Sequence, residues 1–308
     1  MTEHPVSKPI KSNKRARMSG RKVHNFNGVL KSGLYVVATP IGNLKDITLR
    51  ALDVLTQADK VYCEDTRITK KLFSLHGIQR KLGSYHEHSS DYLRAEILRQ
   101  LEDGLSVALI SDAGTPLISD PGYRLVKDVR DAGHEIFSVP GASSPIAALS
   151  IAGFPSDRFL FAGFLPSKSA ARQTTLSELV DIPVTLVLFE SPKRLTGLLK
   201  DIDGLMPDRE VAVCREMTKA FEEVLVGAPA ELIETIDANS SARGEIVVLI
   251  NPPAAREKMS ESEVRESLEV AMKSQPLKTA AAKVAALSGW SKRDVYQLAL
   301  TFSDEENE

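Results

Sequence analysis

The sequence predicts an α/β protein with two α/β domains and a small helical domain behind them. From Gly33 onward, short apolar runs typical of strands alternate with helical patterns, which favours a parallel sheet because short right-handed crossovers connect parallel strands. Two later runs, residues 210–214 and 222–227, have no helix of useful length between them. They should pair antiparallel, which makes the second sheet mixed. Pro252 and Pro253 then separate off an alanine-rich, helical end.

The composition limits the classes of function. The chain has 308 residues, of which 43% are hydrophobic and 26% charged, and its net charge is −2. This balance excludes a uniformly basic nucleic-acid binder but leaves local basic patches open. Cys63 and Cys214 lie in strand-like contexts and are expected to be small buried hydrophobes. With no apolar run of membrane-spanning length and no secretory signal, we expect a cytoplasmic protein without a membrane partner.

Residues 1–32 form a basic N-terminal segment with eight lysines and arginines against one acid, Glu3. It has too few apolar residues to fold alone, so we expect a disordered arm. Two roles stay open at this point, a solubilising tail and an electrostatic arm for RNA.

The first α/β domain is predicted over residues 33–153. Asp46 is expected to cap a helix in which leucines recur at helical spacing, at Leu49, Leu52 and Leu55. The expected strands are residues 34–38, 60–63, 82–85, 106–110 and 135–139. A break at residues 153–157 marks the predicted domain boundary.

The second α/β domain is predicted over residues 154–252 and a helical domain over residues 258–302. Helices are expected from Ser260 to about Lys273, from Leu277 to Leu287, and after Ser291 to Leu300. The short glycine-containing turn between the last two fits a helix-turn-helix. Such a unit serves protein packing as often as nucleic-acid contact, and both alternatives stay open.

Two strand-to-helix junctions predict a ligand site. The strand at 106–110 ends in Ser111-Asp112-Ala113-Gly114-Thr115-Pro116, and the strand at 135–139 ends in Pro140-Gly141-Ala142-Ser143-Ser144. Open parallel sheets bind ligands at this edge, where backbone N–H groups and small side chains gather. No G-x-G-x-x-G motif occurs, so the usual dinucleotide fingerprint is excluded. Asp112 either caps a turn or binds polar groups of the ligand.

Seven segments in order carry a resemblance to one family. They are Leu34-Tyr35-Val36-Val37-Ala38-Thr39-Pro40-Ile41-Gly42-Asn43-Leu44-Lys45-Asp46-Ile47-Thr48, Glu64-Asp65-Thr66-Arg67, Ser84-Tyr85-His86-Glu87-His88, Ser111-Asp112-Ala113-Gly114-Thr115-Pro116, Val139-Pro140-Gly141-Ala142-Ser143, Phe189-Glu190-Ser191-Pro192-Lys193-Arg194 and Cys214-Arg215-Glu216-Met217-Thr218-Lys219. The set resembles the ribosomal RNA small subunit methyltransferase I family, a bacterial branch of the tetrapyrrole methylase superfamily. The resemblance covers about residues 33–251, and the helical end matches the extra C-terminal domain of that family.

The resemblance implies a homodimer of two-domain subunits that bind S-adenosylmethionine in the cleft between the α/β domains. It implies methyl transfer to the 2′-hydroxyl of a cytidine in the decoding region of 16S ribosomal RNA. The partner is then either free small-subunit ribosomal RNA or the assembled small ribosomal subunit.

The expected cofactor-binding residues come from both domains. Small side chains and backbone groups suit the first-domain set Pro40, Ile41, Asp112, Ala113, Thr115, Ser143 and Ser144. By the superfamily's pattern, the pocket is closed by Ile118, Phe189, Met217, Gly244 and Glu245. The alternatives are that Ser143 and Ser144 only cap a helix, and that Phe189 and Met217 belong to the core.

Methyl transfer to a hydroxyl is an in-line displacement, aided by alignment and by a base or a cation near the hydroxyl. Glu190, at a strand end, is the first candidate for that group, followed by Lys219 and Glu216. The alternative for Glu190 is a favourable charge at a helix N-terminus.

Basic residues near the predicted cleft are candidate phosphate contacts, although each could instead belong to a surface ion pair. They are Arg67, Lys70, Lys71, Lys193, Arg194 and Arg215. His86 and His88 lack further ligands at a useful spacing, so no metal is expected.

Two rival functions remain. A methyltransferase acting on a tetrapyrrole precursor would share the fold, but the basic arm and the C-terminal helices favour a large anionic partner. A non-catalytic RNA-binding assembly factor with a cofactor-sensing site would bind the cofactor and transfer nothing, so turnover separates it from the enzyme.

Overall fold

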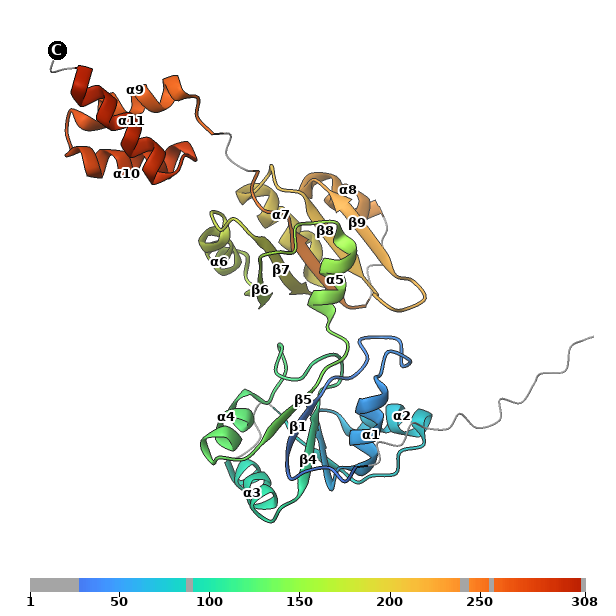
Figure 1. Cartoon of the computed structure of the whole chain (residues 1–308). Helices are drawn as coiled ribbons and strands as arrows, with labels where there is room; N and C mark the ends of the chain where they lie inside the picture. Colours follow the sequence, from blue (N-terminus) through green and yellow to red (C-terminus); the bar gives the residue numbers. More distant parts are fainter. Residues whose placement is uncertain (1–27, 87–90, 239–243, 255–257, 306–308) are drawn as a thin grey trace, which may run out of the picture.

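The computed structural model describes residues 28–86, 91–238, 244–254 and 258–305 (Figure 1). The chain forms two sheets in succession and ends in a group of three helices. Residues 1–27 of the expected basic arm, and His88, lie outside the described residues.

The first sheet is entirely parallel, as the alternating pattern predicts. Its strand order is β3-β2-β4-β1-β5. The strands are β1 (Gly33–Val37), β2 (Lys60–Cys63), β3 (Leu82–Ser84), β4 (Ser106–Ile110) and β5 (Ile136–Val139). β4 is the central strand and all five of its residues are buried, because both its edges and both its faces are covered.

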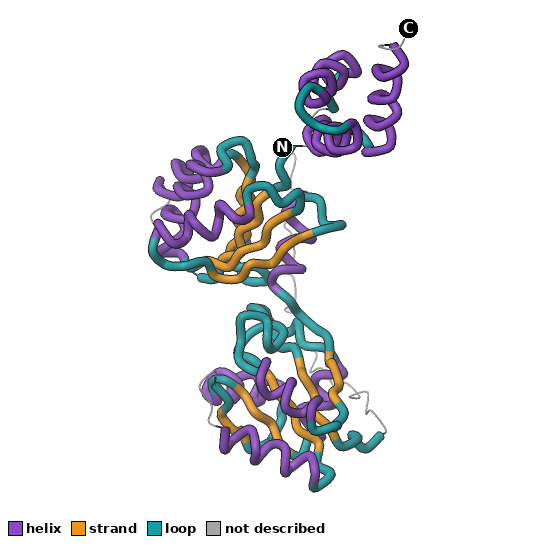
Figure 2. The backbone as a smooth tube through the Cα atoms, turned by 90° about the vertical axis from the view of Figure 1, so that its left-hand side faces the viewer, coloured by secondary structure: helices purple, strands orange, loops and turns teal. Residues whose placement is uncertain are grey.

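Helices cover both faces of the first sheet. Alternate residues of β1 point to opposite faces: Tyr35 and Val37 pack with one pair of helices, and Leu34 packs with the other. The helices on the first face are α1 (Leu49–Gln57) and α2 (Thr66–His76), and those on the second are α3 (Asp91–Glu102) and α4 (Tyr123–Asp131). Figure 2 shows these layers.

The second sheet is mixed, which confirms the prediction. Its order is β6-β7-β10-β8-β9, and only the β6–β7 pair is parallel. The strands are β6 (Phe159–Phe164), β7 (Thr185–Glu190), β8 (Val211–Arg215), β9 (Glu223–Gly227) and β10 (Ile246–Ile250). One face is covered by α6 (Ser169–Leu179), α7 (Pro192–Leu205) and α8 (Pro229–Ala238).

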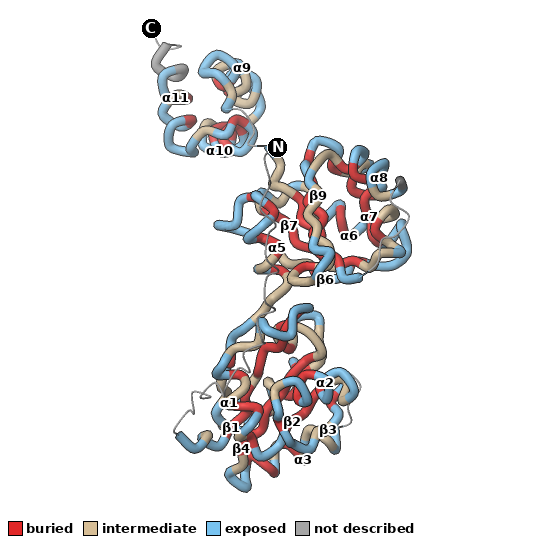
Figure 3. Tube along the Cα trace, turned by 90° about the vertical axis from the view of Figure 1, so that its right-hand side faces the viewer, coloured by how far each residue is buried: buried red, intermediate tan, exposed pale blue. Residues whose placement is uncertain are grey.

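Helix α5 (Ser144–Ala152) corrects the predicted domain boundary. The boundary at residues 153–154 assigned this helix to the first domain, but Ala148, Leu149 and Ala152 pack on the free face of the second sheet. The helix is apolar on nearly every side, and that open sheet face is the surface that buries it. The chain therefore passes from the first sheet and its helices to the second before α5, and Figure 3 shows α5 beside the strands of the second sheet.

The start of α1 corrects a second prediction. Asp46 does not cap the helix; its backbone N–H donates to the carbonyl of Asn43 in a turn. Thr48 is the N-cap residue, and its hydroxyl accepts the N–H of Ala51 at 3.1 Å. Either residue type suits an N-cap, so the preceding turn decided which one takes the position.

Thr48→Ala is expected to lower the free energy of unfolding by about 1 kcal/mol, because the first turn of α1 loses its side-chain acceptor. Urea unfolding followed by circular dichroism measures the change. Asp46→Ala is the matched control and should leave stability almost unchanged. An equal loss in both variants would contradict the assignment of Thr48 as the cap.

The three C-terminal helices have a core of their own. They are α9 (Glu261–Met272), α10 (Leu277–Ser288) and α11 (Lys292–Glu305), the last one longer than predicted. Ser260 and Glu263 form a capping box at α9, and Ser291 accepts the N–H of Asp294 at the start of α11. Gly289, with φ +72°, ends α10. This group stands apart from both sheets in Figure 1.

Candidate active site

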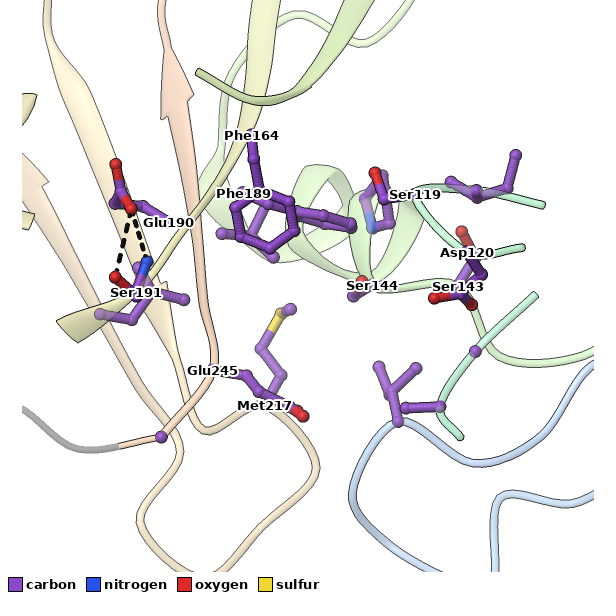
Figure 4. A pocket seen from close by; sticks show the side chains of 18 of the residues that line it. Ser119, Asp120, Ser143, Ser144, Phe164, Phe189, Glu190, Ser191, Met217 and Glu245 are labelled. Atoms are coloured by element: carbon purple, nitrogen blue, oxygen red, sulfur yellow. Dashed lines mark hydrogen bonds between the residues drawn. The ribbon is translucent and has the colours of Figure 1, made fainter. Parts of the chain in front are cut away.

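A pocket of about 300 Å³ lies between the two sheets (Figure 4). The loops after the first-sheet strands form one wall, with Ile41, Ala113, Gly114, Thr115, Ile118, Ser119, Asp120, Ser143, Ser144 and Pro145. The second sheet and its loops form the other, with Phe164, Phe189, Glu190, Ser191, Pro192, Met217, Gly244, Glu245, Ile246 and Val247. The site therefore needs both sheets.

Backbone hydrogen bonds hold the loops of the first wall together. Thr39 and Gly114 exchange two of them, at 2.8 and 3.1 Å, and so join the loop after β1 to the loop after β4. The Thr115 hydroxyl donates to the carbonyl of Ala142 at 3.1 Å, which adds the loop after β5. The loops after three strands are thus joined into one rim. Because these hydrogen bonds already hold the loops in place, ligand binding does not have to order them.

Strained backbone lies on both sides of the pocket. Leu117 and Ser119 have φ of 75° and 63°, and Glu216 and Thr218 have φ of 51° and 65°. Residues other than glycine rarely adopt this left-handed region, and such positions cluster at ligand sites. The turns at Leu117 and Ser119 bring the loop after β4 back over the pocket.

The two walls are in direct contact beside the pocket. The N–H of Asn43, after β1, donates to the hydroxyl of Thr218, after β8, at 2.9 Å. A Cβ atom added to Gly42 would lie 2.7 Å from the same hydroxyl oxygen and 2.8 Å from Cγ of Lys219. Glycine at position 42 therefore allows the loops to meet.

Aromatic rings line the second wall. The ring of Phe189 packs edge-on against Phe161 at 4.9 Å between centroids, and Phe164 lies 5.4 Å from it. The Phe164 ring is exposed and the Met217 side chain lies below it in the pocket (Figure 4). An apolar wall with a polar rim opposite suits a flat heterocycle that carries polar groups.

The structure brings most of the expected cofactor-binding residues to this pocket. Lining positions are held by Ile41, Ala113, Thr115, Ile118, Ser143, Ser144, Phe189, Met217, Gly244 and Glu245. Pro40 and Asp112 are not among the lining residues. The Asp112 carboxylate instead accepts the N–H of Asp65 at 2.9 Å in a neighbouring hollow, because it follows β4 on the side of β2.

The N-terminus of α5 points at the pocket. Ser143 is its N-cap residue, but its hydroxyl makes no capping bond within the described part of the chain. The capping alternative for Ser143 therefore has no support, and the hydroxyl is available to a ligand. Free backbone N–H groups of the first helical turn offer an anion site at the same place.

Glu190 lies where the helix-terminus alternative put it. Its side chain is fully buried, Oε1 accepts the N–H of Ser191 at 2.7 Å, and Arg194 pairs with it at 3.1 Å. Phe189 faces the pocket, so the carboxylate of the next residue in the strand points to the opposite face, as Figure 4 shows. Glu190 is nevertheless one of the residues that line the pocket, and one of its carboxylate oxygens is held by Ser191 and Arg194.

Lys219 and Glu216 form an ion pair at the contact between the walls. Nζ of Lys219 lies 2.8 Å from Oε1 of Glu216 and 3.3 Å from Oε2 of Glu245. Burial works to lower the pKa of Lys219, but the two carboxylates outweigh it and raise that pKa. The hydrogen bond from Lys219 lowers the pKa of Glu216. Both groups are therefore held in their charged forms.

The six candidate phosphate contacts divide into two groups. Arg67, Lys70, Lys71 and Lys193 are exposed. Arg194 donates to the carbonyl of Leu165 at 2.7 Å besides pairing with Glu190, and Arg215 pairs with Glu223 at 2.8 Å. These partners agree with the alternative that Arg194 and Arg215 belong to ion pairs within the protein.

Asp120 is the lining residue of greatest chemical interest that sequence reasoning missed. Burial first, and then the nearby carboxylates of Glu64 and Asp112, raise its pKa to about 6 against the opposing effect of a hydrogen bond from Ser111. The second Asp-containing turn, Ser119-Asp120-Pro121-Gly122, was a visible signal.

Within the described residues, no group of three His, Cys, Asp or Glu side chains is placed to hold a metal ion. Cys63 and Cys214 are both buried and unpaired, as predicted. Among the described helices, none has the length and apolar character needed to cross a membrane.

Comparison with known proteins agrees with this architecture. Residues 33–233 match the family model of tetrapyrrole (corrin/porphyrin) methylases, and residues 258–303 match a model described as the RsmI C-terminal HTH domain. Diphthine synthase is similar in structure, with a TM-score of 0.56 at 14% identity over 71% of this chain and 89% of its own. Uroporphyrin-III C-methyltransferase from Thermus thermophilus, in complex with S-adenyl homocysteine, gives 0.50 at 18% identity over 71% and 97%.

Sequence relatives are much closer. A ribosomal RNA small subunit methyltransferase I of Mesorhizobium japonicum is 45% identical over 91% of this chain and 95% of its own length. Proteins of the same name are 48% identical in Rickettsia prowazekii, over 72% and 79%, and 41% identical in Escherichia coli O157:H7, over 91% and 98%. The predicted fold class is confirmed. The chain belongs to the ribosomal RNA small subunit methyltransferase I family, built on the tetrapyrrole methylase fold.

Proposed function

We propose that the protein uses S-adenosylmethionine to methylate the 2′-hydroxyl of a cytidine in 16S ribosomal RNA. The observation that carries this proposal is the pocket between the sheets in a chain that is 41 to 48% identical to small-subunit methyltransferases. A tetrapyrrole methyltransferase would share the fold, but the solved tetrapyrrole enzymes are less than a quarter identical in sequence. The added helices α9–α11 also favour a macromolecular substrate.

The pocket fits the proposed cofactor in size and chemistry. A volume of about 300 Å³ is in the range of small-molecule sites. Phe164 and Phe189 supply an apolar wall for the adenine. The N–H groups at the start of α5 suit the carboxylate of the methionine part, and Glu245 suits its ammonium group. When bound, the cofactor supplies a methyl group already activated by a sulfonium.

The RNA requires positive charge at the mouth of the site. The exposed side chains of Arg67, Lys70 and Lys71 on α2, and of Lys193 at the start of α7, are proposed to contact phosphates. Such contacts give an affinity that falls steeply as the salt concentration rises. Lys219 and Glu216, close to the same mouth, are proposed to position the substrate rather than to take up its proton, since each is neutralised by its partner.

Label transfer from methyl-tritiated S-adenosylmethionine tests the proposed function. Purified protein is offered unmethylated small ribosomal subunits, free 16S ribosomal RNA and a porphyrinogen in parallel. The expected result is alkali-stable label in RNA, because a methylated ribose resists cleavage at its phosphodiester. Label in the porphyrinogen alone would establish the tetrapyrrole alternative. Cofactor binding without any transfer would establish the sensing factor.

We further propose that the protein acts in the cytoplasm as a homodimer. Its proposed substrate is assembled there, and exposed apolar side chains on α5 and β6 offer a surface for a second copy, namely Ile146, Ile151 and Phe159. Sedimentation equilibrium is expected to give twice the mass of 33.6 kDa. A single species of 33.6 kDa, the mass of one chain, at micromolar concentration would contradict the dimer.

A further inference from the structure

A second hollow, of about 440 Å³, lies beside the cofactor pocket. It stands at the carboxyl ends of β2, β3 and β4 and is lined by Glu64, Asp65, Thr66, Arg67, Ser84, His86 and Asp112. The two hollows share the loop after β4: Asp112 lines the second hollow, and the next residue, Ala113, lines the cofactor pocket. Nothing in the proposed cofactor site uses the second hollow.

The second hollow combines acceptor groups inside with a cation at its edge. Arg67 and Asp65 are paired at 2.5 Å, but the Arg67 side chain is 86% exposed and can also reach a phosphate. The Ser84 hydroxyl and a ring nitrogen of His86 lie 2.7 Å apart. Burial and the charge of Asp112 raise the pKa of Glu64. An anionic interior with a cationic edge suits a nucleotide whose base carries an amino group.

Asp120 lines the cofactor pocket and lies near two residues of the second hollow. Its carboxylate is close enough to Glu64 and Asp112 for their charges to act on it. The left-handed residues Leu117 and Ser119 turn the loop so that Asp120 returns to this place. A half-buried carboxylate beside both ligand sites is positioned to act as a general base.

We propose that the second hollow receives the acceptor nucleotide and that Asp120 accepts the proton of its ribose 2′-hydroxyl. This inference rests on the proposed function. The hydroxyl oxygen forms a bond to the methyl carbon as the bond from that carbon to sulfur breaks. The hydroxyl proton passes to the Asp120 carboxylate and from there to water, and the thioether product leaves.

The same hollow distinguishes cytosine from uracil. The amino group of cytosine has two hydrogens to donate, and Glu64 and Asp112 offer carboxylate oxygens to accept them. Uracil has a carbonyl oxygen at that position, which the carboxylates repel. A glutamine at position 64 removes one charge and supplies an N–H donor, so it should accept both bases.

Asp120→Asn tests the base. The asparagine keeps the shape of the side chain but cannot take up the proton, so we expect kcat to fall by about 10²- to 10⁴-fold. In the wild type, the rate of methyl transfer should rise as the pH passes through about 6, because the Asp120 carboxyl group then loses its proton despite the nearby charges of Glu64 and Asp112. This rising part of the pH–rate profile should be absent in the variant. Cofactor affinity by calorimetry should change less than about threefold.

Two results would overturn this role. A loss of cofactor affinity in Asp120→Asn, with an unchanged melting temperature, would make Asp120 a cofactor ligand. An unchanged kcat would exclude it as the base. Asp208→Asn, at an exposed position in the turn between α7 and β8, is the matched control and should match the wild type in all three measurements.

Glu64→Gln tests the nucleotide site. Small subunits with cytidine or uridine at the target position are compared as substrates. We expect the wild type to favour cytidine strongly and the variant to lose about tenfold or more of that preference in kcat/KM. Without cofactor, the variant should also bind small subunits that carry cytidine at the target position more weakly than the wild type does. Glu178→Gln is the control, because it makes the same replacement of a carboxylate by a carboxamide at an exposed position on α6.

An unchanged preference for cytidine in Glu64→Gln would show that the cytosine ring does not bind in this hollow. These failures are distinct from a failure of the proposed function. If wild-type protein transfers no label to any RNA, the proposed function itself is wrong. If it methylates RNA while both variants behave as the wild type does, only the second hollow is misassigned.

Discussion

Ser144→Trp is expected to reduce the affinity for S-adenosylmethionine by about 100-fold or more and to abolish methyl transfer, while the protein stays folded. Ser144 is the first residue of α5 and lies on the wall of a pocket of only about 300 Å³ (Figure 4). An indole there occupies the space of the ligand and covers the helix N-terminus. A 100-fold loss corresponds to about 2.7 kcal/mol of binding free energy. Calorimetric titration measures it.

Ser150→Trp is the control on the same helix. Ser150 is exposed and is not a lining residue, so its replacement adds the same bulk away from the pocket. Cofactor affinity should stay within about threefold of the wild type. If Ser144→Trp bound the cofactor normally, the pocket between the sheets would not be the cofactor site.

Asp201→Asn is expected to destabilise the protein by about 3 kcal/mol, because it breaks a buried ion pair. Asp201 on α7 and Arg172 on α6 are 7% and 6% exposed and lie 2.6 Å apart. Asp201 also accepts hydrogen bonds from Ser169 and Gln173, each at 2.8 Å. Its replacement leaves a buried guanidinium without a counter-charge. Urea unfolding measures the loss.

The stability contribution of Asp201 also depends on pH. Burial works to raise its pKa, but hydrogen bonds from Gln173, Ser169 and Arg172 outweigh it, and the pKa lies below the ordinary value of 3.8. For a carboxyl group whose pKa is lowered on folding, the contribution is fully present above the unfolded value and is lost as the pH falls through the folded value. The difference between wild type and variant should therefore shrink below pH 4.

Two further variants check the explanation. Asp131→Asn breaks an ion pair with Lys127 whose side chains are 59% and 58% exposed, so it should cost less than about 0.5 kcal/mol. The double variant Arg172→Met, Asp201→Leu removes both buried charges and should recover most of the loss. Equal costs for Asp201→Asn and Asp131→Asn would show that the buried pair carries no special stability.

Particular elements show how far sequence reasoning reached. The loop from Ser111 to Pro116 was placed at a ligand site because the carboxyl ends of parallel strands share one edge of a sheet, and the pocket lies there. The same argument failed for Asp112, whose neighbour Ala113 takes the lining position instead. Asp112 and Ala113 line different hollows, and only the conformation of the loop decides which of its residues face the ligand.

The sequence by itself determined the order of strands and helices, the parallel first sheet, the mixed second sheet and the family. These follow from hydrophobic period, from the presence or absence of a helix between strands, and from local motifs. Only the tertiary structure decided that α5 packs on the second sheet, that Glu190 is buried beside Arg194, and that Asp120 lines the cofactor pocket. These placements depend on contacts between segments far apart in the chain, which no local pattern encodes.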